Sequence, residues 1–388
     1  MQMAAERLDV GSTDLHQLVD RATRVLGDDG VVILPTETMY AVAGRAASPD
    51  ARRQLRLVRR PSAPAAAASQ SAPPPLTLHL PSAAAASDVL GPSVLARGPM
   101  PHRLMTRLWP GPVGLVFDIP ADDQPRMAER LGVPPEDLFD PQGRITLRCP
   151  DEPLTRAVLS AFPQPVACTQ ATDEHGRPAH RLADVTPATL DAARLALDAG
   201  PTRFNRPSTL LHVFPDHFAV LRAGVYDQRI VDRMLTTTLL FVCSGNTCRS
   251  PMAMALARKL LAARLGVREA ELESRGYRVI SAGTMAFPGS RATTQAVQAA
   301  GELGADLSAH RSQPLTVELI QQAQAIYTMG RSHKAMVLAM VPSAEAKTTT
   351  LDPTGDIEDP IGSDVSVYRE LAHKLEQLIE SRLDQFTS

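Results

Sequence analysis

The feature that most constrains this chain is a strand, a short polar loop and a helix that follow one another at residues 239–251. The segment reads Leu-Leu-Phe-Val-Cys-Ser-Gly-Asn-Thr-Cys-Arg-Ser-Pro. Its apolar start favours a buried strand ending at Cys243, and apolar residues at a four-residue spacing after Pro251 favour an amphipathic helix. A loop that ends on a helix N terminus directs free N–H groups and the positive end of the helix dipole at one point. The segment therefore predicts a site for a phosphoryl group with a cysteine at its centre.

The polar residues of this loop, called the cradle below (residues 243–250), suit phosphoryl chemistry. A positive field favours the thiolate of Cys243, which is the form that attacks phosphorus. The guanidinium of Arg249 offers a planar fork of donors that lysine cannot reproduce. We therefore expect Cys243 and Arg249 to be catalytic. We expect the other cradle residues to bind the phosphate, namely Ser244, Gly245, Asn246, Thr247, Cys248 and Ser250.

Phosphate hydrolysis also needs a proton donor for the leaving group. Asp359 begins the segment Asp-Pro-Ile-Gly, in which proline and glycine favour a loop that presents the carboxyl group over the cradle. Asp352, which is also followed by proline, is a nearby alternative. Taken alone, either Asp-Pro pair is more often the start of an ordinary turn. The residues that follow Asp359 favour it, so we predict Asp359 as the general acid.

From about residue 239 to the C terminus, the chain resembles the low-molecular-weight protein tyrosine phosphatases, and most closely their protein arginine phosphatase branch. The resemblance rests on the cradle and on three further stretches: Ser281-Ala282-Gly283-Thr284, Tyr327-Thr328-Met329, and Asp359-Pro360 with Tyr368 beyond. It implies a cysteinyl-phosphate on Cys243, a phosphate clamp by Arg249, and Asp359 as acid and then as base for water. It also implies a phosphorylated protein as substrate and no cofactor.

Two residues of the cradle leave alternatives open. Thr247 resembles the arginine phosphatase branch, whereas tyrosine-directed members usually carry a bulkier aliphatic residue, so the substrate is phosphoarginine or phosphotyrosine. Cys248 either forms a reversible disulfide with Cys243, as the resemblance implies, or only packs there. Arsenate reduction on the same scaffold needs cysteines beyond Cys248, and the sequence has none, which disfavours that activity.

The first half carries a separate motif. Residues 31–34 favour a buried strand, and residues 35–40 follow as a polar turn that can bind a nucleotide or a carboxylate. Residues 10–225 resemble the threonylcarbamoyl-AMP synthases, which use threonine, bicarbonate and ATP for a tRNA modification. This implies ATP as a substrate. The residues that it implies for nucleotide binding are Thr36, Thr38, Arg60, Ser208 and Thr209.

The first half also departs from the synthases. Val58 stands where family members usually carry a lysine, and a charge-assisted contact of this kind contributes about 1.5–3 kcal/mol. Residues 167–172 lack the Ser-Ala-Asn element, and residues 61–75, rich in alanine, proline and serine, predict a flexible surface loop. Two hypotheses follow: an active synthase fused to the phosphatase, or a module that only binds nucleotide or RNA and localises the phosphatase.

At 388 residues the chain is long enough for two domains, which we predict at residues 1–230 and 237–388. In both domains apolar strands alternate with helices, which predicts an α/β fold for each. We expect the first to be a synthase-like twisted α/β domain and the second to be a phosphatase domain with a parallel sheet flanked by helices. We expect strands at residues 31–34 and 145–147. We expect helices at residues 13–26, 153–161 and 187–197.

The overall composition excludes several classes of protein. A formal net charge of −2 argues against a broad nucleic-acid or membrane footprint, so neither is an expected direct partner. No apolar run has the length of a signal peptide core or of a membrane span. Four cysteines, one of them needed as a thiolate, suit a reducing compartment. We expect a cytoplasmic protein with no bound metal.

Overall fold

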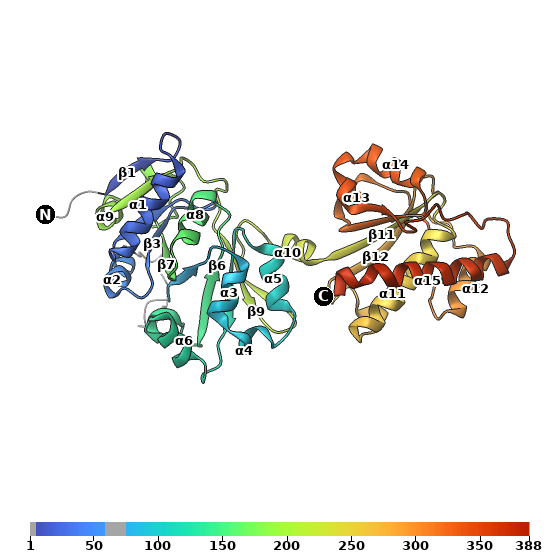
Figure 1. The fold of residues 1–388 in the computed structure, drawn as a ribbon, viewed down its shortest axis with the longest axis horizontal. Helices are drawn as coiled ribbons and strands as arrows, with labels where there is room; N and C mark the ends of the chain where they lie inside the picture. Colours follow the sequence, from blue (N-terminus) through green and yellow to red (C-terminus); the bar gives the residue numbers. More distant parts are fainter. Residues whose placement is uncertain (1–4, 59–74, 388) are drawn as a thin grey trace. The chain divides into compact units, whose positions relative to one another are not determined.

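The structure is a computed structural model that describes residues 5–58 and 75–387, with side chains described to residue 383. The chain divides into two compact units, Met1–Leu235 and Thr236–Ser388. Each unit has its own sheet with helices packed against it (Figure 1). Within the described residues, no helix is both long and apolar enough to cross a bilayer.

The described part of the first unit contains a ten-stranded mixed sheet. Its strands, in spatial order, are β1 (Glu6–Asp9), β8 (Leu195–Asp198), β2 (Val31–Leu34), β3 (Ala41–Arg45), β7 (Val166–Gln170), β4 (Thr77–His79), β6 (Arg144–Arg148), β5 (Val113–Asp118), β9 (Thr209–Val213) and β10 (Phe218–Arg222). The helices are α1 (Leu15–Gly27), α2 (Pro49–Val58), α3 (Ala83–Leu90), α4 (Pro92–Leu95), α5 (Met100–Leu108), α6 (Gln124–Leu131), α7 (Pro135–Leu138), α8 (Pro153–Ala161), α9 (Pro187–Ala192) and α10 (Gln228–Leu235), with a 3-10 turn at Leu182–Asp184.

Strand β2 shows why its sequence is continuously apolar. Val31 and Ile33 pack into one apolar cluster, whereas Val32 and Leu34 pack into another. Alternate residues of a strand point to opposite faces of a sheet, so both faces of β2 are covered. The strand predicted at residues 31–34 and the helix predicted at residues 153–161 are confirmed by β2 and α8.

The helix predicted at residues 187–197 is wrong in its second half. Helix α9 ends at Ala192, and β8 begins at Leu195. Leu195, Ala196 and Leu197 are fully buried, and β8 runs parallel to both β1 and β2. A short apolar run fits a buried strand as well as a helix, and its place between two strands decides the outcome. The predicted flexible loop falls almost wholly on residues 59–74, outside the described residues.

The described part of the second unit contains a four-stranded sheet in the order β12 (Tyr277–Gly283), β11 (Thr237–Cys243), β13 (Ala325–Thr328) and β14 (Thr348–Thr350). All neighbouring pairs are parallel. The helices are α11 (Arg249–Leu265), α12 (Thr294–Glu302), α13 (Val317–Gln322), α14 (Arg331–Met340) and α15 (Val365–Thr387), with 3-10 turns at Glu269–Glu271 and Pro342–Lys347.

Two apolar clusters cover the two faces of this parallel sheet. One joins β11 to α11, α12 and α15, and the other joins it to α13 and α14 (Figure 1). The expected parallel sheet flanked by helices is confirmed. Because parallel strands end at one edge of a sheet, Cys243, Gly283 and Thr328 share that edge. Ligand sites of open α/β sheets lie at this carboxyl edge.

Candidate active site

The cradle connects the end of β11 to the first turn of α11. Cys243 is the last residue of β11 and is 2% exposed. Its Sγ receives a hydrogen bond from the backbone N–H of Asn246 at 3.3 Å and lies 2.9 Å from the hydroxyl oxygen of Ser250. Helix α11 begins at Arg249 without a side-chain cap. The sulfur therefore faces donors and the positive end of a helix, both of which favour an anion.

Asn246 holds the cradle in a conformation that few residues adopt. Its φ is 55°, in the left-handed region where asparagine is tolerated. Its Nδ2 donates to Ser250 Oγ at 3.0 Å and to Ser281 Oγ at 2.9 Å, while its Oδ1 accepts from Gln313 N at 2.9 Å. His310 Nε2 lies 2.9 Å from the carbonyl oxygen of Asn246. These contacts assign Asn246 to loop geometry.

The histidine of this network is neutral near pH 7. Burial lowers the pKa of His310, and the bond to the Asn246 carbonyl only partly opposes this effect. A neutral ring that donates from Nε2 satisfies that carbonyl. The contacts of His310, Gln313 and Ser281 could not be predicted from the sequence, because His310 and Gln313 lie in loop segments and Ser281 lies in β12, all far along the chain from Asn246.

Arg249 and Asp359 lie in direct contact. Arg249 Nη2 forms an ion pair with Asp359 Oδ2 and lies 3.4 Å from Ser244 Oγ, while its Nη1 donates to the carbonyl of Ile357 at 2.9 Å. The Arg249 side chain is 8% exposed and that of Asp359 is 40% exposed. The carboxylate thus occupies the fork that a phosphoryl group would use.

The other aspartate considered for acid catalysis has a structural role. Asp352 is 4% exposed and forms a 2.7 Å ion pair with Lys374 Nζ. It also accepts hydrogen bonds from Thr354 N and Oγ1 at 2.8 and 2.6 Å. The bond from Lys374, followed by the bonds from Thr354, holds the pKa of the Asp352 carboxyl well below its usual range. Asp352 is therefore committed to local contacts, whereas Asp359 contacts the cradle arginine.

The side chain of Cys248, within the cradle, lies close to three hydroxyl groups. Its Sγ is 3.4 Å from Tyr368 Oη and 3.5 Å from Thr293 Oγ1, and Thr247 Oγ1 lies 3.7 Å from it. Burial raises the pKa of Tyr368 to about 12, so the phenol stays protonated. Cys248 packs in the same apolar cluster as Cys243, and both are free thiols. This packing is compatible with both interpretations of Cys248, so the disulfide stays a prediction.

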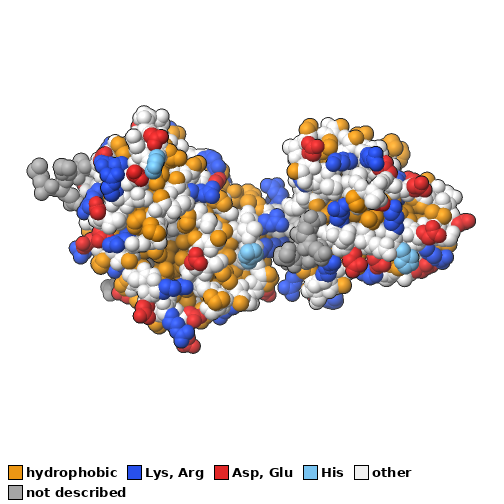
Figure 2. Space-filling model, in the orientation of Figure 1, with side chains coloured by type: hydrophobic (Ala, Val, Ile, Leu, Met, Phe, Trp, Pro, Cys, Tyr) orange, Lys and Arg blue, Asp and Glu red, His pale blue; other side chains and the backbone are white. Residues whose placement is uncertain are grey.

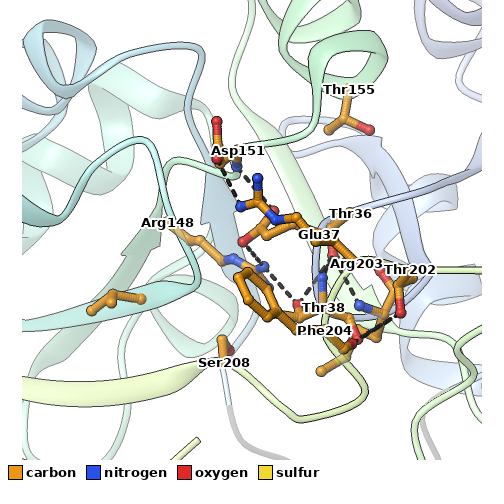
Figure 3. Close-up of polar contacts among 12 residues, drawn as sticks. Thr36, Glu37, Thr38, Arg148, Asp151, Thr155, Thr202, Arg203, Phe204 and Ser208 are labelled. Atoms are coloured by element: carbon orange, nitrogen blue, oxygen red, sulfur yellow. Dashed lines mark hydrogen bonds and ion pairs between the residues drawn. The ribbon is translucent and has the colours of Figure 1, made fainter. Parts of the chain in front are cut away.

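The first unit also contains a buried polar cluster, which is shown in Figure 3. Thr36, Glu37 and Thr38, which follow β2, are each at most 2% exposed. Arg148 Nη2, at the end of β6, donates to Glu37 Oε1 and to Thr38 Oγ1, both at 2.7 Å. Thr36 Oγ1 lies 3.1 Å from Thr38 Oγ1. The two predicted threonines therefore lie together, beside an ion pair that sequence analysis did not identify.

The remaining residues predicted for nucleotide binding are placed differently. Ser208 is 6% exposed, and its Oγ and carbonyl accept from Arg222 at 3.2 and 3.0 Å. Thr209 Oγ1 donates to the Tyr226 carbonyl at 2.6 Å and accepts from Tyr226 N at 2.9 Å, so local backbone occupies this hydroxyl. Arg60 lies outside the described residues.

Both halves match known families. Residues 24–224 match the family of Sua5, YciO and YrdC, described as telomere recombination, and residues 238–387 match the family described as low molecular weight phosphotyrosine protein phosphatase. The protein-arginine-phosphatase of Bacillus subtilis is 36% identical over 152 residues, which are 38% of this chain and 95% of that protein. The protein-arginine-phosphatase of Geobacillus stearothermophilus is 40% identical over 150 residues, 37% of this chain and 90% of that protein.

The first half has a more distant relative. The threonylcarbamoyl-AMP synthase of Bacillus subtilis is 27% identical over 224 residues, which are 56% of this chain. The chain spans 56% of that relative's length. These matches confirm both resemblances drawn from the sequence motifs. The chain therefore belongs to two families. Its first half is a domain of the Sua5, YciO and YrdC family, and its second half is a low-molecular-weight protein-tyrosine/arginine phosphatase domain, which is a hydrolase.

Proposed function

We propose that the second unit dephosphorylates proteins through a cysteinyl-phosphate on Cys243. The observation that carries this proposal is the arrangement at one sheet edge, where the sulfur faces the Asn246 N–H and Arg249 contacts Asp359. A nucleophile, an anion clamp and a proton donor are the three groups that such a reaction needs. Because the reaction needs reduced Cys243, the proposal places the protein in a reducing compartment such as the cytoplasm.

The reaction takes two displacements. The Cys243 thiolate attacks phosphorus, a P–S bond forms, and the bond to the leaving group breaks as Asp359 gives that group a proton. Asp359, now a carboxylate, then takes a proton from water, the water oxygen attacks phosphorus, and the P–S bond breaks to release phosphate and the thiolate. In both steps Arg249 and the cradle N–H groups bind the equatorial oxygens.

We propose phosphoarginine as the preferred substrate. Thr247 is smaller than the aliphatic residue expected in tyrosine-directed enzymes, and the two relatives above are named as arginine phosphatases. One observation favours phosphotyrosine as the second candidate. Phe287 and Met285, on the loop after β12, are 83% and 73% exposed, and Met285 N donates to the Ser244 carbonyl at 3.0 Å. This places apolar surface beside the cradle, where an aromatic leaving group could pack.

Thr247→Ile is expected to shift preference from phosphoarginine toward phosphotyrosine by about 10-fold or more, because added methyl groups crowd the guanidine-binding space. The measurement is kcat/KM for two peptides that differ only in the phosphorylated residue. The wild type should turn over the phosphoarginine peptide faster. Faster turnover of phosphotyrosine by the wild type would make phosphotyrosine the substrate and refute our reading of Thr247.

For the first unit we propose that ATP, threonine and bicarbonate are its ligands and that the cluster around Arg148 contributes to their site. Val58, at the end of α2, is 7% exposed and supplies no charge. Val58→Lys is therefore expected to raise pyrophosphate release about 10-fold in the presence of the three ligands. Val58→Met, of similar length and neutral, serves as the control. If neither the wild type nor Val58→Lys releases pyrophosphate, a binding module replaces the synthase hypothesis.

A further inference from the structure

His333 lies at the phosphatase site, although neither step of the proposed reaction uses it. It stands in the first turn of α14, directly after the end of β13. The residue is 7% exposed, and its Nε2 lies 2.8 Å from Ser244 Oγ. Its Nδ1 is buried and has no hydrogen-bond partner among the described residues. A buried ring with one satisfied nitrogen has a single fixed contact, and that contact is a cradle residue.

The contact continues from Ser244 to the catalytic arginine. Ser244 Oγ lies 3.4 Å from Arg249 Nη2, the same nitrogen that pairs with Asp359. The three side chains therefore form a line from α14 to the phosphate clamp: His333, Ser244, Arg249. When a phosphoryl group replaces Asp359 on the guanidinium, Ser244 remains as a protein partner on that side of the fork.

Hydrogen-bond chemistry sets the direction of these contacts. Burial, and then the neighbouring charge of Arg249, lowers the pKa of His333, while Asp356 and Asp359 oppose the shift. The neutral ring carries one N–H. A hydrogen on Nδ1 would leave a buried donor without a partner, and this costs more than a bare acceptor. Nε2 therefore donates to Ser244, and arginine can only donate. Ser244 oxygen accepts from both and keeps its own hydrogen free for a ligand.

We infer that His333 is a positioning residue of the phosphatase site, which acts through Ser244 to orient a hydroxyl donor and the Arg249 guanidinium toward the phosphoryl group. The inference rests on the proposed function and deepens it. It assigns the Ser244 hydroxyl hydrogen to a phosphoryl oxygen, and it assigns to α14 a part in phosphate binding. Without the ring, the hydroxyl rotates freely and Nη2 loses a fixed neighbour.

The test compares His333→Leu with His333→Gln. Leucine removes the donor, and we expect kcat/KM for an aryl phosphate to fall about 10-fold and the inhibition constant of inorganic phosphate to rise about as much. Glutamine places an amide N–H at a reach similar to Nε2, so it should retain activity within about 3-fold of wild type. Ser332→Ala, on the exposed side of the same helical turn, is the matched control.

The pairwise effect separates positioning from general destabilisation. In a Ser244→Ala background, His333→Leu should change neither kcat/KM nor phosphate inhibition, since its only route to Arg249 is gone. An equal loss in both backgrounds, or a glutamine variant as impaired as leucine, would overturn the inference. The proposed function fails separately, if the wild type does not hydrolyse the aryl phosphate.

Discussion

Cys243→Ser is expected to lower kcat for an aryl phosphate by about 10⁴–10⁶-fold. A serine hydroxyl is a far weaker nucleophile than a cysteine sulfur, and among the described residues no base lies in hydrogen-bond contact with residue 243 to activate it, since its contacts are Asn246 N–H and Ser250 Oγ. The serine oxygen can keep both contacts, so the cradle keeps its shape. Steady-state kinetics should therefore show the loss of turnover. Calorimetry should show that the variant still binds inorganic phosphate.

Trapping of the intermediate checks the same residue independently. Acid quench during turnover, followed by mass mapping, should place the phosphoryl label on Cys243. The thiols of the first unit provide the control, because burial raises the pKa of Cys149 to about 11 and that of Cys168 further. Both stay protonated near neutral pH, and Cys149→Ala should leave turnover unchanged. A label on any other side chain would contradict Cys243 as the nucleophile.

The cradle could be predicted because its chemistry is local. Strand, loop and helix are contiguous at residues 239–251, so spacing alone brings Cys243 to the N terminus of α11. The parallel sheet was also predictable, because buried strands alternate with helices. Asp359 was predicted from the residues that follow it, and the fold adds that Asp359 contacts Arg249 whereas Asp352 pairs with Lys374.

The residues that shape the cradle could not be predicted from spacing. His310, Gln313 and Ser281 reach Asn246 from segments 35 to 67 positions away, and Ile357 contributes only a backbone carbonyl. A carbonyl has no sequence signature. His333 left one weak signal, a histidine shortly after an apolar strand, which more often marks an ordinary core residue.

In the first half, the sequence motif predicted the threonines and missed their partner. Arg148 and Glu37 are 111 positions apart, and β4, β7 and β3 lie between β6 and β2 in the sheet, so the folded domain and not the local sequence brings the two side chains together. The error at β8 has a related cause, because three buried residues carry no periodicity that distinguishes a strand from a helix. Contacts with segments far away in the sequence decide both cases, and the local sequence pattern does not contain these contacts.

Asp359→Asn is expected to change catalysis and phosphate binding in opposite directions. Loss of the proton donor should lower kcat about 10²–10⁴-fold on a substrate with a poor leaving group, and less on p-nitrophenyl phosphate, whose leaving group needs no proton. The same change removes the carboxylate from Arg249. Because the Asp359 side chain is 40% exposed, removal of its charge should tighten inorganic phosphate binding by only about 2–5-fold. Kinetics on both substrates and phosphate inhibition measure the two effects.

Glu358→Gln distinguishes the roles of Asp359 from simple loss of negative charge. Glu358 is exposed and borders the same 370 Å³ pocket as Asp359. Glu358→Gln removes one negative charge beside the site. If phosphate binding tightens only through the loss of a nearby charge, this variant should bind phosphate more tightly too, while its kcat should stay at the wild-type value. If Asp359→Asn weakens phosphate binding, the carboxylate does not compete for Arg249. If it lowers kcat equally for both leaving groups, Asp359 does not donate the proton, and another acid must serve the first displacement.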